Sequence, residues 1–206
     1  MRSTVMISAD EALSGRSEAI VINPINAVLG TSMLEAPTGA RVVYLGMGCF
    51  WGAERVFWQQ AGVISTAVGY GGGYTPNPSY EEVCTSNTGH TELVKVIYDP
   101  TQVTLEALLA LFWEKHDPTQ AMRQGNDIGT QYRSAIFLES DADAVLANGT
   151  KSAYQQALNA KGLGAIATEI AVQVPFYFAE DYHQQYLHKN PAGYCGIGGT
   201  GVVCPI

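Results

Sequence analysis

The sequence predicts an α/β fold in which helices pack on a mixed β-sheet, and three features indicate it. The 206 residues are 47% hydrophobic and 15% charged, which is typical of a compact domain with a sizeable core. Apolar residues alternate in some segments and recur every three or four residues in others, so both strands and helices are expected. Their predicted order is strand, helix, strand, strand, helix, strand, helix, strand. Split βαβ units in this order are typical of a ferredoxin-like α/β plait.

The first 40 residues differ in character from the rest. Residues 1–40 mix Ala, Ser, Asn and Pro without a sustained period, so we expect a long irregular extension that packs on the body. The segment 40–48 is typical of a strand that runs into a glycine turn, and the apolar spacing over 50–61 predicts a helix. Residues 63–71 are rich in strand-forming residues and lead into a loop dense in Gly and Pro.

The alternation continues through the second half of the chain. A strand is predicted over 92–98, and Thr104 caps an amphipathic helix whose leucines and aromatic residues form one apolar stripe. After Pro175 regular structure becomes sparse, apart from a short helix that 180–190 could form before a glycine-rich tail. The other predicted elements are a polar loop over 124–130, a strand over 131–138, a helix over 141–160 and a strand over 165–174.

Charge and composition exclude several classes of protein. The formal net charge of −8 disfavours nucleic-acid binding, because the phosphate backbone is also negative. No run approaches the roughly 18 apolar residues of a membrane span, and the N-terminal residues lack the features of a signal peptide. The four histidines lack a convincing ligand spacing, and no Cys-x-x-Cys pair occurs. We therefore expect a cytoplasmic protein that binds no nucleic acid, membrane or metal, and we take it to be a monomer.

Cys49 lies in the stretch GMGCFWGAERVFW, where glycines precede it and Phe50 and Trp51 follow it. If the helix begins near Phe50, its unpaired N–H groups and its dipole favour a thiolate, lower the pKa of Cys49 and make it nucleophilic. Gly46 and Gly48 would allow a sharp turn that leaves the sulfur accessible. The alternative is a turn whose cysteine only fills space. The aromatic pair favours a reactive thiol that must admit an apolar group beside it.

Cys195 and Cys204 fall within the last twelve residues, whereas the other 194 residues hold only two cysteines. Five glycines from Gly193 to Gly201 indicate a mobile tail. A thiol that becomes a sulfenic acid needs a second thiol to condense with it, and a third thiol can then carry the disulfide to the surface. The alternative is a frayed C-terminus with incidental cysteines.

Glu92 alternates with Val94 and Val96 along its predicted strand, so we expect its carboxyl group to point to the more apolar side. Burial would raise the pKa of this carboxyl and keep it ready to donate a proton. The alternative is a strand-edge carboxylate in water. Three further residues in or beside loops could hydrogen-bond an oxygen or orient a partner, although each is also an ordinary loop residue: Tyr80, Asp127 and Tyr132.

Six sequence blocks in fixed order resemble those of the A-type peptide methionine sulfoxide reductases, from about residue 40 to the end. The block GCFWG alone is suggestive, and together with NDIGTQYRS it is specific. The blocks are GCFWG (48–52), GYGGGYTPNPSYEEVC (69–84), TGHTE (88–92), HDPTQ (116–120), QGNDIGTQYRS (124–134) and HQQYLHKNPAGYCGIGG (183–199).

The resemblance implies reduction of the S epimer of methionine sulfoxide, free or in oxidised proteins that are thereby repaired, with thioredoxin as electron donor. It implies that Cys49 attacks the sulfoxide sulfur and becomes a sulfenic acid. Cys195 would resolve that acid, and Cys204 would recycle the disulfide, although Cys204 lies about one residue farther along than the family pattern. No flavin or metal is needed. Cys84 has no catalytic part in the family, so we expect it to be structural.

The resemblance also implies a substrate pocket with two unlike sides. Glu92 would hydrogen-bond or protonate the sulfoxide oxygen, assisted by Tyr80 and Tyr132, with Asp127 in support. The aromatic residues Phe50 and Trp51 would hold the methyl group, and such asymmetry selects one epimer.

These predictions divide the chain into an N-terminal extension (1–40), a catalytic α/β domain (41–175) and a C-terminal segment of the same domain that carries the recycling cysteines (176–206). Two other functions stay open. A thiol peroxidase would also form a sulfenic acid, and a redox sensor that does not turn over would keep the pocket.

Overall fold

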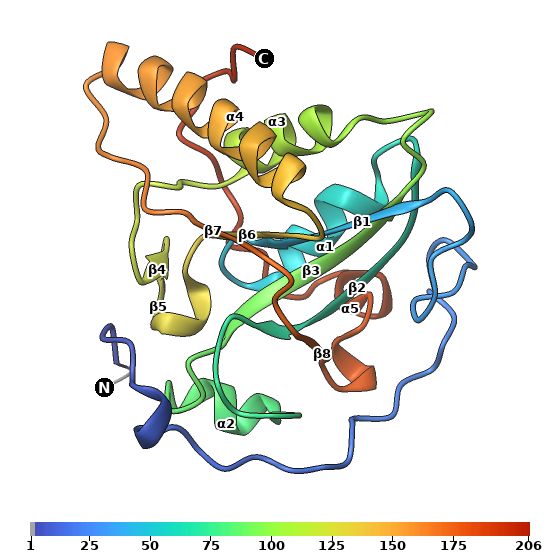
Figure 1. The fold of residues 1–206 in the computed structure, drawn as a ribbon. Helices are drawn as coiled ribbons and strands as arrows, with labels where there is room; N and C mark the ends of the chain where they lie inside the picture. The colour runs from blue at the N-terminus through green and yellow to red at the C-terminus, as the bar shows by residue number, and fades with distance from the viewer. Residues whose placement is uncertain (1–2) are drawn as a thin grey trace.

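The structure is a computed structural model that describes residues 3–206, and its centre is a six-stranded sheet (Figure 1). The strand order is β7-β6-β1-β3-β2-β8. The β6–β7 pair is parallel and the other neighbours are antiparallel, so the predicted mixed sheet is confirmed. The strands are β1 (Arg41–Gly46), β2 (Val63–Gly71), β3 (Thr91–Tyr98), β6 (Ala135–Leu138), β7 (Glu169–Val172) and β8 (Phe176–Phe178).

Helices connect these strands in the predicted alternation. Two of them, α3 and α4, lie above the sheet in the view of Figure 1, where α1 overlaps the strands β1 and β3, and all three contribute to one core cluster. Thr104 caps α3 as predicted, since its side chain accepts a hydrogen bond from the Ala107 N–H. The helices are α1 (Phe50–Trp58), α2 (Tyr80–Cys84), α3 (Leu105–Lys115), α4 (Asp141–Ala160) and α5 (Tyr186–Lys189), and the small hairpin consists of β4 (Arg123–Gln124) and β5 (Asp127–Ile128).

Several elements were not predicted, among them the hairpin β4–β5, which lies in the segment expected to be a polar loop, and the elements α2 and β8. The helix α2 lies in the segment expected to be a loop, and a capping box starts it: Ser79 Oγ accepts the Glu82 N–H, and the Glu82 carboxylate accepts the Ser79 N–H. The strand β8 follows Pro175, where regular structure was expected to become sparse, and it pairs with the end of β2. Three consecutive aromatic residues show no alternation, which is why the pattern did not reveal this strand.

Two predicted strands are shorter than expected. The strand predicted over 131–138 begins at Ala135, because Thr130–Tyr132 form a 3₁₀ turn. The strand predicted over 165–174 is limited to Glu169–Val172, since it pairs in register with the four residues of β6. The residues before Ala135 and before Glu169 therefore lie in loops, at the edge of the sheet where β1 ends at Gly46.

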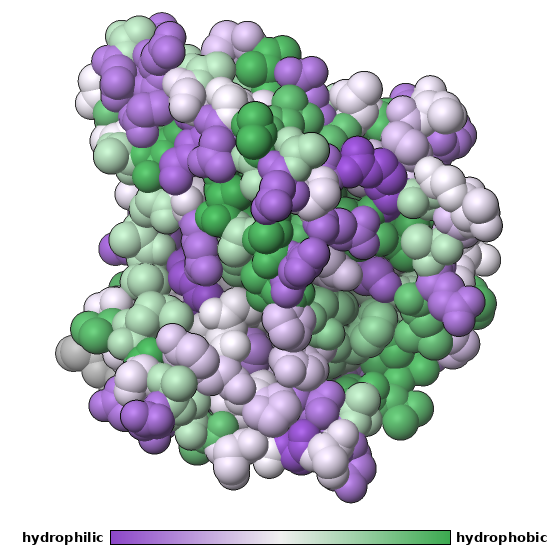
Figure 2. Space-filling view, viewed as in Figure 1, coloured by the Kyte–Doolittle hydropathy of each residue, from purple (hydrophilic) through white to green (hydrophobic). Residues whose placement is uncertain are grey.

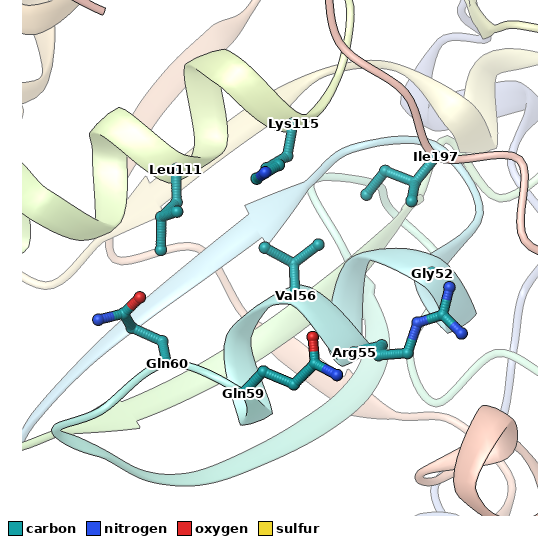
Figure 3. Close-up of a pocket in the computed structure, with 8 residues that line it drawn as sticks. All are labelled: Gly52, Arg55, Val56, Gln59, Gln60, Leu111, Lys115 and Ile197. Atoms are coloured by element: carbon teal, nitrogen blue, oxygen red, sulfur yellow. The ribbon is translucent and has the colours of Figure 1, made fainter.

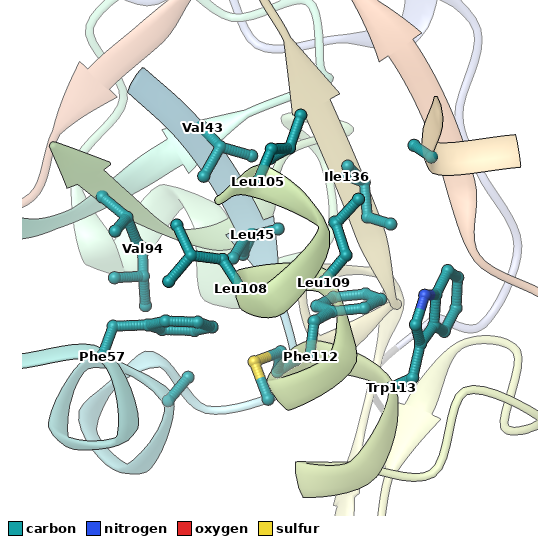
Figure 4. Close-up of a cluster of buried hydrophobic side chains, with 14 of the residues drawn as sticks. Val43, Leu45, Phe57, Val94, Leu105, Leu108, Leu109, Phe112, Trp113 and Ile136 are labelled. Carbon is teal, nitrogen blue, oxygen red and sulfur yellow. The ribbon is translucent and has the colours of Figure 1, made fainter. Parts of the chain in front are cut away.

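The hydrophobic core fills the space between the helices and one face of the sheet (Figure 4). Val94 and Val96 of β3 point into it, as the alternation predicted, and they are fully buried. The apolar stripe of α3 packs against them and against β1 and β6: Leu105, Leu108, Leu109, Phe112 and Trp113. Because Glu92 has the same strand parity, this packing also directs its side chain to the helix-covered face.

Residues 3–40 run along the body and are held by specific hydrogen bonds. Asn26 Nδ2 donates to the Thr66 carbonyl at 2.9 Å, and the buried Lys95 ammonium donates to the Met33 carbonyl at 3.0 Å. Five large apolar side chains of this segment are exposed: Val5, Leu13, Val21, Ile25 and Leu34. Apolar surface is visible at the lower right of Figure 2, where part of the segment runs in Figure 1.

Glu54 is a fully buried carboxyl group that joins α1 to the C-terminal segment. It accepts hydrogen bonds from Thr66 Oγ1 at 2.9 Å, from the Gln185 N–H at 2.9 Å and from Gln185 Nε2 at 2.8 Å. Burial raises the pKa of Glu54 to about 7, although these hydrogen bonds favour the ionised form.

This shift predicts a pH-dependent effect of Glu54→Gln. The folded chain retains a proton that the unfolded chain releases near pH 4.5, so the stability contributed by Glu54 falls as pH rises from about 4.5 to about 7. The difference between the pKa of Glu54 in the unfolded chain and in the folded chain corresponds to on the order of 3 kcal/mol of folding stability. We expect the free energy of unfolding of wild type relative to Glu54→Gln to fall by that order between pH 5 and pH 8. Urea unfolding of both proteins measures it, and an equal difference at both pH values would contradict the prediction.

None of the helices within residues 3–206 has both the length and the apolar character required to cross a membrane.

Candidate active site

Cys49 lies at the junction where β1 ends and α1 begins. It is the N-cap residue of α1, as predicted. Gly48 has φ +87°, and a Cβ there would lie 2.5 Å from Gln124 Cβ, so the turn requires glycine. A Cβ on Gly46 would lie 3.2 Å from the Glu92 carbonyl oxygen. The two glycines therefore bring the Cys49 thiol against β3 at Glu92.

The electrostatic surroundings of Cys49 differ from the prediction of a lowered pKa. Burial raises the pKa of the thiol well above its usual range, and the negative charge of Glu92 raises it further. A hydrogen bond from the Trp51 backbone N–H acts in the opposite direction but is the weaker effect. The helix N-terminus is thus outweighed first by burial and second by the Glu92 charge, which the sequence does not place beside Cys49. Both effects favour the thiol over the thiolate.

Glu92 is only 2% exposed and lies on β3, between β1 and β2 in the sheet. Its Oε2 accepts the Phe50 backbone N–H at 2.9 Å, so the carboxyl group binds the first turn of α1 directly after Cys49. The alternative of a solvated strand-edge carboxylate is wrong. Because it is buried and bound to the residue after Cys49, this carboxyl group is placed to exchange a proton with a ligand at Cys49.

The two aromatic residues after Cys49 are fixed from the C-terminal segment. Phe50 is fully buried and packs against the His183 ring, with ring centroids 5.2 Å apart. Trp51 stacks on Tyr186 with centroids 3.8 Å apart and planes 12° apart, and its indole N–H donates to His183 Nδ1 at 3.0 Å. Burial lowers the pKa of His183 to about 4, so its ring is neutral and Nδ1 accepts.

His183 is a site residue that the sequence reasoning missed. The four histidines were considered only as metal ligands, yet His183 lies in the block HQQYLHKN and orients Trp51. Within residues 3–206 no group of three or more His, Cys, Asp or Glu side chains is arranged to hold a metal ion.

The predicted polar residues come from three other elements, and Tyr80 reaches the same ring as the aromatic pair, since its ring packs on His183 with centroids 4.6 Å apart. Tyr80 begins α2 instead of lying in a loop, and burial raises the pKa of its hydroxyl, which donates to the Cys84 sulfur. Glu92 and Tyr132 both act electrostatically on the same hydroxyl, so these groups lie within electrostatic reach of it. Tyr132 is buried in the 3₁₀ turn before β6.

Asp127 lies on β5 and is half-buried. Its Oδ2 accepts a hydrogen bond from the Tyr194 hydroxyl at 3.2 Å, and its charge raises the pKa of Cys49. Since Tyr194 directly precedes Cys195, this bond ties the tail to the polar side of the site.

Cys195 lies over the first two turns of α1. A Cβ on Gly52 would come within 3.0 Å of its sulfur, and Arg55 Nη2 donates to that sulfur at 3.0 Å. Its charge also acts on the Cys49 thiol. No disulfide joins any of the four cysteines, all of which lie in the described part of the chain.

Cys204 is not on a mobile arm, which corrects the prediction. Its side chain is 7% exposed, its backbone N–H donates to Glu114 Oε1 at 2.7 Å, and the Tyr154 hydroxyl binds the Val202 carbonyl at 3.2 Å. Burial and the Glu114 charge raise the pKa of Cys204 to about 11. The tail docks because Val202 and Cys204 join the core between α3 and α4, and the five glycines do not prevent it.

A cavity of about 270 Å³ lies between α1 and α3, beside the tail (Figure 3). Two cations line it, Arg55 from α1 and Lys115 from α3, and in Figure 3 the Arg55 guanidinium points toward Gly52. The lining residues are Gly52, Arg55, Val56, Gln59, Gln60, Leu111, Lys115 and Ile197.

Comparison with known proteins identifies the family. Residues 41–201 match the model of the family described as peptide methionine sulfoxide reductase. The chain is 63% identical to peptide methionine sulfoxide reductase MsrA 1 of Caulobacter vibrioides, over 98% of this chain and 93% of that protein.

Two solved structures share the fold. Methionine sulfoxide reductase A of Corynebacterium diphtheriae has a TM-score of 0.88 and 49% identity, and the match covers 98% of this chain and 99% of that one. Mxr1 of Saccharomyces cerevisiae, solved in complex with Trx2, has a TM-score of 0.51 and 25% identity over 77% of this chain and 93% of that one. The chain therefore belongs to the A-type peptide methionine sulfoxide reductases.

Proposed function

We propose that this chain reduces the S epimer of methionine sulfoxide, free and in oxidised proteins, and takes its electrons from thioredoxin. The observation that carries the proposal is the group of reactive side chains at the start of α1: the half-buried Cys49 thiol, the buried Glu92 carboxyl and the half-buried Cys195 sulfur. The names of the relatives support the substrate class. The yeast relative, solved in complex with Trx2, supports thioredoxin as the reductant.

The first step is attack of the Cys49 sulfur on the sulfoxide sulfur. The sulfoxide oxygen is transferred to Cys49, methionine leaves, and a sulfenic acid remains. Glu92 protonates or hydrogen-bonds the oxygen during this step. Its charge opposes a Cys49 thiolate, so a neutral Glu92 serves both reactants: it supplies a proton and no longer disfavours the thiolate.

The unlike sides of the site select the epimer. Phe50 and Trp51 form the apolar wall for the methyl group, and the polar side offers Tyr80, Tyr132 and, in support, Asp127 for the oxygen. Exchange of oxygen and methyl would bury the oxygen against aromatic carbon and leave the hydroxyls without an acceptor, which costs binding.

The experiment is an NADPH-coupled thioredoxin assay with separated sulfoxide epimers and, in parallel, hydrogen peroxide. We expect turnover of the S epimer, none of the R epimer, and peroxide consumption far slower than sulfoxide reduction. Preference for peroxide would indicate a thiol peroxidase, and absence of turnover with any oxidant would indicate a redox sensor. Either result would reject the proposal.

The second half of the cycle uses the tail. Cys195 attacks the Cys49 sulfenic acid, which forms a disulfide and releases water, and Cys204 then takes over that disulfide for thioredoxin. Because Cys204 is held against α3 by Glu114, the segment from Cys195 to Cys204 has to leave this helix before the exchange. The same segment carries the recycling role proposed for residues 176–206.

Cys204→Ser should therefore complete one turnover and accumulate the Cys49–Cys195 disulfide. Steady-state recycling should slow by roughly tenfold or more, because an intramolecular thiol has an effective concentration of about millimolar. Stopped-flow and coupled assays measure the two steps. Val203→Ser is the matched control, since Val203 is the neighbouring residue and is 75% exposed. Unchanged steady-state turnover in Cys204→Ser would show that thioredoxin reduces the first disulfide directly.

A further inference from the structure

Arg55 contacts the Cys195 sulfur directly. Its Nη2 donates to Cys195 Sγ at 3.0 Å from the second turn of α1, the helix that Cys49 caps. A guanidinium is positively charged at every accessible pH, and its donors have fixed planar directions. A hydrogen bond from such a group to a sulfur is stronger when the sulfur is a thiolate.

The Cys195 sulfur packs against the surface of α1 at a position that only a glycine leaves open. Gly52 leaves a notch in α1, since a Cβ there would approach Cys195 Sγ to 3.0 Å and Ile197 Cβ to 3.2 Å. Arg55 lies one turn farther along on the same side, and Figure 3 shows Gly52, Arg55 and Ile197 at one end of the cavity. The tail thus places its sulfur in the notch, and the guanidinium holds it there.

The contacts of Arg55 do not indicate a structural ion pair. Among residues 3–206 its side chain forms no salt bridge, and Cys195 Sγ is its one hydrogen-bond acceptor. Lys115 also lines the cavity, but it is exposed and has no contact of this kind with the sulfur. A role in maintaining the fold would require partners that Arg55 lacks.

We propose that Arg55 is a catalytic residue of the step that resolves the sulfenic acid, an inference that rests on the proposed function. Arg55 holds the Cys195 sulfur at 3.0 Å, and its guanidinium stabilises the negative charge that this sulfur carries when it loses its proton to react as a thiolate. The thiolate attacks the Cys49 sulfur, an S–S bond forms, and the S–O bond breaks. The departing hydroxide takes up the proton that Cys195 released and leaves as water. When the disulfide is later opened, the same guanidinium stabilises Cys195 as the leaving thiolate.

The test separates methionine release from disulfide formation in Arg55→Met, which retains much of the apolar stem. After mixing with one equivalent of the S epimer, methionine is quantified by chromatography, and the sulfenic acid is trapped with dimedone. We expect methionine release within about twofold of wild type. Disulfide formation should slow by roughly ten- to a hundredfold, as expected when a charge-assisted hydrogen bond is lost. Arg55→Lys should restore part of the rate.

Lys115→Met is the matched control, because it removes the other cation of the same cavity. It should leave both steps unchanged. Disulfide formation at the wild-type rate in Arg55→Met would overturn the inference. So would an equal loss in Lys115→Met, or a parallel loss of methionine release, which would indicate a structural or general electrostatic effect. Failure of wild type to release methionine would reject the proposed function instead.

Discussion

Cys49→Ser abolishes methionine formation, even in a single turnover, if Cys49 is the nucleophile. A serine hydroxyl at the N-cap of α1 preserves the helix start, but it is a far weaker nucleophile than a thiol. Cys195 is held over Gly52 and Cys204 is buried against α3, so neither of the tail thiols is placed to take over the attack.

Rapid-quench measurement of methionine after mixing with the S epimer and excess dithiothreitol tests this expectation. Cys204→Ser is the matched control, since it changes the same atom in a thiol that the first step does not use. Methionine release from Cys49→Ser at near wild-type rates would mean that another group attacks the sulfoxide.

Glu92→Gln slows the reductase step by roughly 10²- to 10⁴-fold, the range of general acid catalysis. Glutamine has nearly the same shape, and its amide oxygen can still accept the Phe50 N–H, so the fold should persist. The amide cannot supply an acidic proton to the sulfoxide oxygen. The same change removes the negative charge that raises the pKa of Cys49, so the thiol should become more reactive toward iodoacetamide.

These opposite effects distinguish loss of a proton donor from damage to the site. Damage would lower both rates, whereas the proposed role predicts faster alkylation and slower reduction in one protein. Glu106→Gln is the control, since Glu106 is exposed on α3 and should change neither rate. An unchanged single-turnover rate in Glu92→Gln would show that the oxygen obtains its proton elsewhere.

Local patterns predicted the parts of the site that depend on neighbouring residues. Glycine on both sides of Met47 and the apolar spacing after Cys49 placed that thiol at a helix start. The alternation of Glu92 with Val94 gave the direction of its carboxyl group, because strand parity is a local property. The capping box at Ser79 was present in the sequence but was not used, and α2 was therefore missed.

Features that depend on distant segments could not be predicted. The raised pKa of Cys49 comes first from burial by the elements that pack around it and second from Glu92, which the pairing of β1 with β3 brings close. The docked tail depends on Glu114 and Tyr154, which lie on two helices far from Cys204 in sequence. The glycine content of a segment indicates its backbone flexibility in isolation, but it does not indicate whether other parts of the chain bind that segment.

The most direct test of the proposed chemistry is peptide mapping of the reduced wild-type protein after one equivalent of the S epimer. Digestion after alkylation identifies which sulfurs are bridged, and chromatography counts the methionine released. The proposed cycle predicts about one methionine per chain and a bridge from Cys195 to either Cys49 or Cys204. In Cys204→Ser the bridge should join Cys49 and Cys195 alone. A wild-type protein in which Cys49 is bridged directly to Cys204, with Cys195 always a thiol, would contradict the cycle.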